Sequence, residues 1–229
     1  MLIAQSCIPL SPTIDEESIP LSLKIKNLGI VLDNTLTMEH AVSQVRKVGF
    51  LELRRIRQIR RFIDEDTTKQ LVVSFILSRI DYCNSLYRGI NDEKINKLQI
   101  LQNQAARLVK LAPKTDHISP ILKELHWLPV KARIDYKILI LSFKSIHDAT
   151  FPSYLKDMVE MYLPNRSLRS KRKTLLKKPR TQLKTFGDRS FYYSAPDLWN
   201  GLPENILNSS CLSAFRKNVK TWLFQSHYN

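Results

Sequence analysis

Acidic side chains form three short clusters that are candidates for holding a catalytic metal ion. A nucleotidyl-transferring polymerase needs at least two carboxylates to hold two metal ions about 3.5 to 4 Å apart. The first cluster lies in a proline-rich polar stretch, and the other two lie where predicted helices begin and acidic residues suit the helix dipole. None has an apolar strand beside it, so we expect no catalytic residue, no metal and no cofactor. The clusters are Asp15-Glu16-Glu17, Asp64-Glu65-Asp66 and Asp92-Glu93.

A hydrolytic site has no better support. Asp116, His117 and Ser119 are residue types of a catalytic triad, but the fold assembles such triads, not adjacency in sequence. We interpret Asp116 and Ser119 as capping residues around Pro120, which suits a helix start, and His126 as a hydrogen-bonded packing residue. The chain has five glycines and neither of the glycine-rich phosphate-binding patterns. We therefore expect no small-molecule substrate.

The charge balance indicates a polyanionic partner. The chain has 36 Lys and Arg against 21 Asp and Glu, a net charge of +15, which is typical of proteins that bind nucleic acid or an anionic membrane. The alternative is that the charge serves solubility alone. Cys7, Cys83 and Cys211 have no zinc-site spacing, and no apolar stretch reaches the ~20 residues that span a bilayer. We expect an intracellular protein, nuclear or cytoplasmic, with no membrane partner.

Two segments concentrate the positive charge. Apolar residues recur with helical period over 36–63, and the opposite face of this predicted helix is basic; the alternative for this face is simple solvation. Residues 163–185 contain nine Lys or Arg and no acid, so we predict an extended or disordered segment, which might otherwise serve as a nuclear-localisation signal. The candidate nucleic-acid-binding residues are Arg46, Lys47, Phe50, Arg54, Arg57 and Arg61 in the first segment, and Arg166, Arg169, Lys171, Arg172, Lys173, Lys177, Lys178, Arg180 and Lys184 in the second.

Periodicity predicts a mainly α fold: a helical bundle after a short β segment, followed by a basic, aromatic C-terminal segment. A strand is predicted over 23–32, and helices over 36–63, 67–86, 92–111, 119–128, 130–147, 154–162 and 210–224. Asp64 and Asn91 are predicted N-caps, and Phe191, Tyr192, Tyr193 and Trp199 a predicted aromatic cluster. The expected domains are 1–35, 36–150 and 151–229.

Several short motifs occur in a fixed order along the chain. They are Lys26–Asp33, Ser78–Asn84, Gln102–Arg107, His117–Pro120, Leu125–Val130, Phe186–Arg189 and Trp199–Pro203. Together they resemble the end of the palm, the thumb and the C-terminal region of non-LTR (LINE-type, jockey/CR1-like) retrotransposon reverse transcriptases. The resemblance covers the chain from about residue 24 onward. It implies that 36–150 is a thumb-like helical bundle that grips a primer–template duplex.

The resemblance also implies what is absent. The fingers, most of the palm with its catalytic aspartates, any endonuclease domain and the terminal Cys/His knuckle have no counterpart here, and Mg²⁺ would belong to the missing palm. The expected function is therefore that of a fragment of an RNA-directed DNA polymerase that keeps sequence-independent binding of RNA, DNA or an RNA–DNA duplex, without activity of its own. The alternatives are a piece of a longer, active reverse transcriptase cut short by gene prediction, and a relic product with no function.

Overall fold

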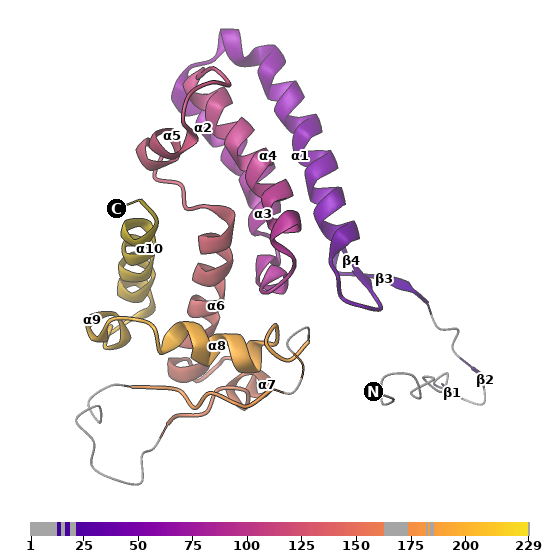
Figure 1. Ribbon diagram of the computed structural model, residues 1–229, viewed down its shortest axis with the longest axis vertical. Coiled ribbons are helices and arrows are strands. Elements are labelled where there is room, and N and C mark those ends of the chain that lie inside the picture. Colours follow the sequence, from indigo (N-terminus) through magenta and orange to yellow (C-terminus); the bar gives the residue numbers. More distant parts are fainter. Residues whose placement is uncertain are drawn as a thin grey trace. The chain divides into compact units, whose positions relative to one another are not determined.

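The computed structural model describes residues 22–162, 174–181, 183 and 186–228, and the backbone of residues 13–14 and 17–18. The described part is mainly helical, as the sequence predicts, and its strands are short and antiparallel (Figure 1). Contacts within the chain define two compact units, whose boundary lies between Ala41 and Val42. None of the helices in the described ranges combines the length and the apolar character that crossing a membrane requires.

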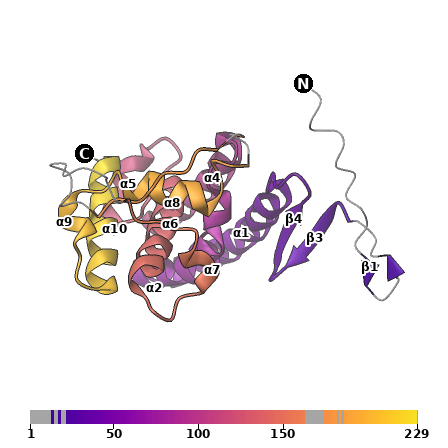
Figure 2. The ribbon, with the colours of Figure 1, turned by 90° about the horizontal axis from the view of Figure 1, so that it is seen from below.

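Short strands form two antiparallel pairs in the described part of the first unit (Figure 2). Leu28 and Gly29 join the second pair and both have positive φ angles, 45° and 85°, as a type I′ hairpin turn requires. The sequence predicts one strand over 23–32, and this prediction is wrong because Gly29 forms a turn within it. The pairs are β1 (Thr13–Ile14) with β2 (Glu17–Ser18), and β3 (Lys24–Asn27) with β4 (Ile30–Asp33).

Asp33 ends the hairpin and organises the loop that follows. Its Oδ1 accepts hydrogen bonds from Thr35 Oγ1 at 2.9 Å and Thr37 N at 2.7 Å. Its Oδ2 accepts from Thr37 Oγ1 and from Met38 N, both at 3.0 Å. Burial opposes ionisation of this carboxyl, but the hydrogen bonds outweigh it and lower its pKa from 3.8 to about 2. Helix α1 (Glu39–Ile59) begins directly after this loop.

The second unit is built of helices joined by short turns. Asp64 accepts a hydrogen bond from Thr67 N at 2.8 Å, and Asn91 accepts one from Glu93 N at 2.9 Å, which confirms both predicted N-caps. After α1 the elements are η1 (Arg60–Phe62), α2 (Glu65–Val72), the π-helical segment η2 (Val73–Leu77), α3 (Ser78–Asp81), η3 (Asn84–Tyr87), α4 (Asp92–Lys110), α5 (Ile118–Glu124), α6 (Val130–His147), α7 (Ser153–Lys156), α8 (Phe191–Trp199), α9 (Glu204–Leu207) and α10 (Leu212–Tyr228).

A glycine allows α1 to approach α4 closely. A Cβ atom built on Gly49 would lie 2.3 Å from Cδ2 of Leu101, a residue with no exposed surface. The apolar stripe predicted for this helix is buried at Leu53 and Ile56, but Ile59 is 44% exposed. The stripe therefore ends one turn before the helix does, and the last turn of α1 faces solvent.

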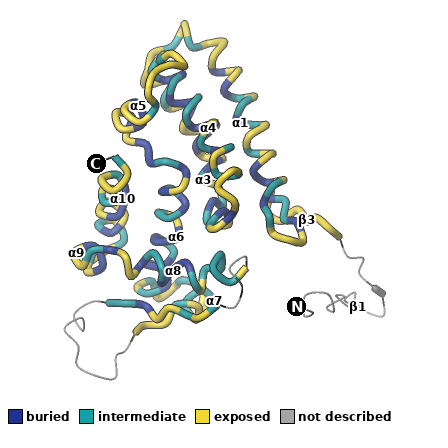
Figure 3. The backbone as a smooth tube through the Cα atoms, viewed as in Figure 1, coloured by how far each residue is buried: buried dark blue, intermediate teal, exposed yellow. Residues whose placement is uncertain are grey.

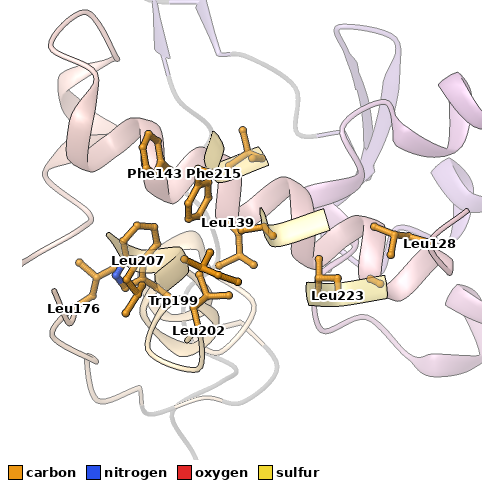
Figure 4. Packing of buried hydrophobic residues seen from close by; sticks show 13 residues of the cluster. Leu128, Leu139, Phe143, Leu176, Trp199, Leu202, Leu207, Phe215 and Leu223 are labelled. Atoms are coloured by element: carbon orange, nitrogen blue, oxygen red, sulfur yellow. The ribbon is translucent and has the colours of Figure 1, made fainter. Parts of the chain in front are cut away.

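Helix α6 forms the centre of the second unit, between α10 and α3 (Figure 1). Buried positions follow one another along its length (Figure 3). Phe143 of α6, Trp199 of α8 and Phe215 of α10 stack at the middle of a large apolar cluster (Figure 4). Because α8 and α10 pack on α6, the predicted boundary at residue 150 does not separate two compact units.

Two predicted helices are shorter than expected. The helix predicted over 67–86 ends at Asp81, because Tyr82 adopts an extended conformation. It was predicted to be central, yet Phe75 on it is 45% exposed. The helix predicted over 154–162 is only α7, after which Met161 pairs with Leu176 in an isolated β-bridge.

Two further predictions from local sequence are wrong. Helix α5 begins at Ile118 with His117 as its N-cap and no side-chain cap, so neither Asp116 nor Ser119 has the predicted capping role. The backbone carbonyl of Asp116 instead accepts a hydrogen bond from Arg107. The predicted aromatic cluster also does not form as expected, because Trp199 stacks with Phe215 at 5.5 Å between ring centroids, while Tyr192 is exposed.

Candidate nucleic-acid interface

A groove runs along the surface between α1 and α4. One hollow, with a volume of about 610 Å³, is lined by Phe50, Arg54 and Arg57 of α1, among others. A second, of about 510 Å³, adjoins it and shares Arg57, Gln104 and Lys114. Neither hollow has an acidic residue among the described residues that line it. We call the two hollows together the basic groove; its polar lining is Arg54, Arg57, Gln58, Arg60, Arg61, Gln104, Arg107 and Lys114.

Helical spacing and one left-handed residue place these cations around the groove. Arg54, Arg57 and Arg61 are three and four residues apart and therefore lie on one face of the helical segment. Helix α4 ends at Leu111, whose φ of 51° is left-handed, so the chain turns and Lys114 contributes to the same groove. The sequence analysis did not select Lys114, Gln104 or Gln58. The helix ending near residue 111 was the available signal for Lys114.

Two arginines of the groove are used to hold the fold. Arg60 donates to three carbonyl oxygens: Leu108 at 3.1 Å, Val109 at 3.0 Å and Ile63 at 2.8 Å. Arg107 donates to the carbonyl oxygens of Pro113 at 3.0 Å and Asp116 at 2.9 Å. These bonds satisfy carbonyl groups at and after the end of α4, which a helix leaves without partners. The sequence gave no indication of either role.

The remaining cations of the groove are available to a ligand. Arg54, Arg57 and Lys114 are exposed, and none forms an ion pair with a described residue. Arg46 and Lys47, which the sequence analysis also selected, are exposed on the same helix. The structure therefore brings Arg54, Arg57 and Arg61 together with Lys114 at one groove, and Arg46 and Lys47 lie outside its lining.

An aromatic ring lies at the groove beside a guanidinium group. Phe50 is half-buried and lines the first hollow, and the guanidinium carbon of Arg46 lies 5.6 Å from its ring centroid. At the other end Phe62 is 73% exposed, and Arg61 lies 4.6 Å from its ring centroid. Exposed rings flanked by cations are the usual means of stacking bases while binding the backbone. The arrangement can bind a phosphodiester chain and one or more of its bases or sugars.

The second predicted basic segment is described only in part. Lys177 pairs with Glu160 at 2.8 Å, and Lys178 pairs with Asp197 at 2.7 Å; hydrogen bonds from the lysines to these carboxylates raise both lysine pKa values. Arg180 is exposed. Lys177 and Lys178 therefore take part in the fold, in a segment that is held by hydrogen bonds rather than disordered. The other predicted residues, Arg166, Arg169, Lys171, Arg172, Lys173 and Lys184, lie outside the described residues.

The motifs that carry the sequence resemblance join distant parts of the fold. Arg133 pairs with Asp81 of the first motif at 2.7 Å, and its Nε donates to the carbonyl of Leu128 at 2.9 Å. Trp199 donates from Nε1 to the carbonyl of Thr174 at 2.7 Å. The side chain of Asn200 bonds both the N–H and the carbonyl of Leu176, at 2.8 Å each. These contacts explain the motifs by packing and hydrogen bonding within the second unit.

The acidic clusters within the described residues have structural partners. Asp64 caps α2, and Glu65 pairs with Lys110 at 2.5 Å together with Glu124. In the described part of the chain no three His, Cys, Asp or Glu residues are grouped so as to hold a metal ion. Comparisons of the chain with models of protein families, with curated proteins and with solved structures return no match.

Proposed function

We propose that the basic groove binds the phosphate backbone of RNA or DNA without sequence selectivity. The observation that carries this proposal is the set of three exposed cations, Arg54, Arg57 and Lys114, around a groove with an aromatic ring and no acidic lining residue. A solvated basic face needs no groove and no ring. Phosphate contacts carry no base information, so binding through this groove is insensitive to sequence.

The motif resemblance supports a more specific form of the proposal. In it, the second unit is the thumb-like part of a retrotransposon reverse transcriptase, and the groove contacts the primer–template duplex. The proposal concerns binding and not catalysis, because Asp64 and Glu65 are engaged in a helix cap and an ion pair. In the alternative, the same groove belongs to a longer, active enzyme. Sequencing the transcript upstream of the Met1 codon distinguishes the two.

The salt dependence of binding tests the groove. For a protein that neutralises phosphates, the logarithm of the binding constant falls with the logarithm of salt concentration, by about 0.9 per phosphate on duplex DNA and about 0.7 on single strands. The double variant Arg54→Gln/Arg57→Gln is expected to reduce that slope by about one of these increments per lost contact. Fluorescence anisotropy with a labelled duplex over a salt series measures it.

A matched control removes the same charge elsewhere. Arg216→Gln/Lys217→Gln neutralises two exposed cations of α10, away from the groove. This control is expected to leave the slope nearly unchanged. Equal effects of the two double variants would show that only the overall charge matters, and an absence of binding at low salt would reject the proposal and favour a product without function.

A further inference from the structure

A second, polar pocket lies where α3, η3, α6 and α10 meet. Its volume is about 480 Å³, which is within the range of small-molecule sites. It shares no lining residue with the basic groove. Two motifs that the sequence analysis singled out converge on it: the first contributes Ser78, Asp81 and Asn84, and the second contributes His126, Trp127 and Leu128.

Asn84 provides an unpartnered polar group in the wall of this pocket. The residue is 2% exposed, and its Oδ1 has no hydrogen-bond partner among the described residues. Its Nδ2 reaches Asp81 Oδ1 only at 3.5 Å. A buried carbonyl oxygen without a donor costs about 1–3 kcal/mol. A ligand N–H that donates to Asn84 would remove this cost.

The pocket also has a surplus of positive charge. Arg133 is fixed by its bonds to Leu128 and Asp81, and no described residue accepts a hydrogen bond from its Nη2. Lys137 of α6 and Lys220 of α10 are exposed, and neither has an ion-pair partner in the described ranges. Arg133 neutralises Asp81, so two uncompensated cations remain. The pocket therefore suits a ligand that carries an anionic group.

We propose that this pocket binds one nucleotide whose base carries an amino group. The amino N–H donates to Oδ1 of Asn84, as asparagine side chains do when they read adenine. The phosphate lies against Arg133, Lys137 and Lys220. His126 and Tyr136 supply aromatic faces for the base. The π-helical segment η2, of a type frequent at functional sites, provides Val73 and Leu77 to the wall. A free nucleotide and an unpaired nucleotide of a strand present this same chemistry.

Isothermal titration of the full chain with AMP, CMP, UMP and inorganic phosphate tests the proposal. AMP and CMP are expected to bind about tenfold more tightly than UMP, since UMP lacks the amino donor. Lys220→Gln is expected to weaken AMP binding about fivefold, by removal of one charge-assisted contact. Lys217→Gln, one turn earlier on the same helix and outside the pocket, is the matched control.

Three results would overturn the proposal: no saturable binding of AMP, equal affinities for AMP and UMP, or equal effects of the Lys220 and Lys217 variants. Asn84→Ala is expected to abolish the preference for AMP over UMP. Because Asn84 is buried, its variant is first checked by circular dichroism. If it does not fold, the nucleotide series and the two lysine variants still decide.

Two further arms separate the source of the ligand and the role of the groove. Competition between AMP and a strand with an unpaired adenosine identifies the strand as a source, and absence of competition identifies the free nucleotide. The variant Arg54→Gln/Arg57→Gln is expected to bind AMP normally. Unchanged AMP binding in that variant, together with an unchanged salt slope for duplex binding, would reject the groove and leave the pocket supported.

Discussion

Arg60 joins the end of α1 to the end of α4: its Nε donates to the carbonyl oxygen of Leu108 at 3.1 Å. A further bond from Nη2 reaches Val109 at 3.0 Å. Arg57, one turn earlier, lines the same groove but holds no carbonyl and no described acidic side chain. Two neighbouring arginines of one groove therefore have different roles, one in the fold and one facing a ligand.

Substitution of these two arginines should separate stability from binding. Arg60→Gln is expected to lower the free energy of unfolding by about 1–3 kcal/mol, because it removes charge-assisted bonds to helix-terminal carbonyls. Arg57→Gln is expected to change it by less than about 0.5 kcal/mol, as surface substitutions usually do. Urea denaturation followed by circular dichroism measures both. Equal destabilisation by the two variants would contradict these assignments.

Gly49 sets the separation of the two helices that form the groove. Gly49→Val places methyl groups where Leu101 is already packed without exposed surface, and should cost about 1–3 kcal/mol of stability. It should also weaken duplex binding, because α1 and α4 are forced apart. Gly201→Ala is the control, since its Cβ would meet nothing closer than 3.5 Å. Thermal unfolding of both variants compares them, and similar melting temperatures would show that the close approach is unimportant.

Asp33 should give a pH dependence confined to the first unit. Its pKa is about 2 in the folded protein against 3.8 ordinarily. A carboxyl with a lowered pKa contributes stability that is complete above the unfolded value, near pH 4, and is lost as the pH falls toward 2. The amide signals of Thr37 and Met38, which donate to Asp33, should titrate with a midpoint near pH 2 in an NMR series. A midpoint near 3.8 would show that the hydrogen bonds do not stabilise the ionised form, and Asp33→Asn should abolish the titration.

Asn200 should anchor the segment around Leu176. Its side chain bonds both backbone groups of Leu176, which is buried in the apolar cluster against Trp199. Asn200→Ala is expected to speed hydrogen exchange at the Leu176 amide by at least about tenfold, through loss of the acceptor and local opening. Asn208→Ala, at an exposed position on α9's C-terminal side, should leave that exchange rate unchanged. Unchanged exchange in the Asn200 variant would contradict the anchoring role.

The sequence predicted most of the helices, because their signals are local. The periodicity of 36–63 and 130–147 and the caps at Asp64 and Asn91 depend on neighbouring residues only, and these predictions are confirmed. The hairpin turn at Gly29 was missed because an alternating apolar pattern continues through it. The end of the helix at Asp81 was missed because its apolar pattern continues beyond it into η3.

The candidate site was predictable on one helix and not across two. Arg54, Arg57 and Arg61 follow from helical spacing, whereas Lys114 reaches the groove only because α4 ends in a left-handed residue and packs beside α1. The role of Arg60 depends on carbonyls 48 and 49 residues away. Lys177 and Lys178 looked equally available in sequence, but Glu160 and Asp197 pair with them in the fold.

Photocrosslinking tests the central claim, that nucleic acid binds in the groove between α1 and α4, most directly. RNA and DNA strands that carry photoreactive bases are bound at low salt and irradiated, and mass spectrometry then identifies the crosslinked peptides. The account predicts crosslinks at Phe50 and on the Ile100–Gln104 stretch of α4, and their loss in Arg54→Gln/Arg57→Gln. Crosslinks confined to peptides outside the groove, with the same pattern in the variant, would contradict it.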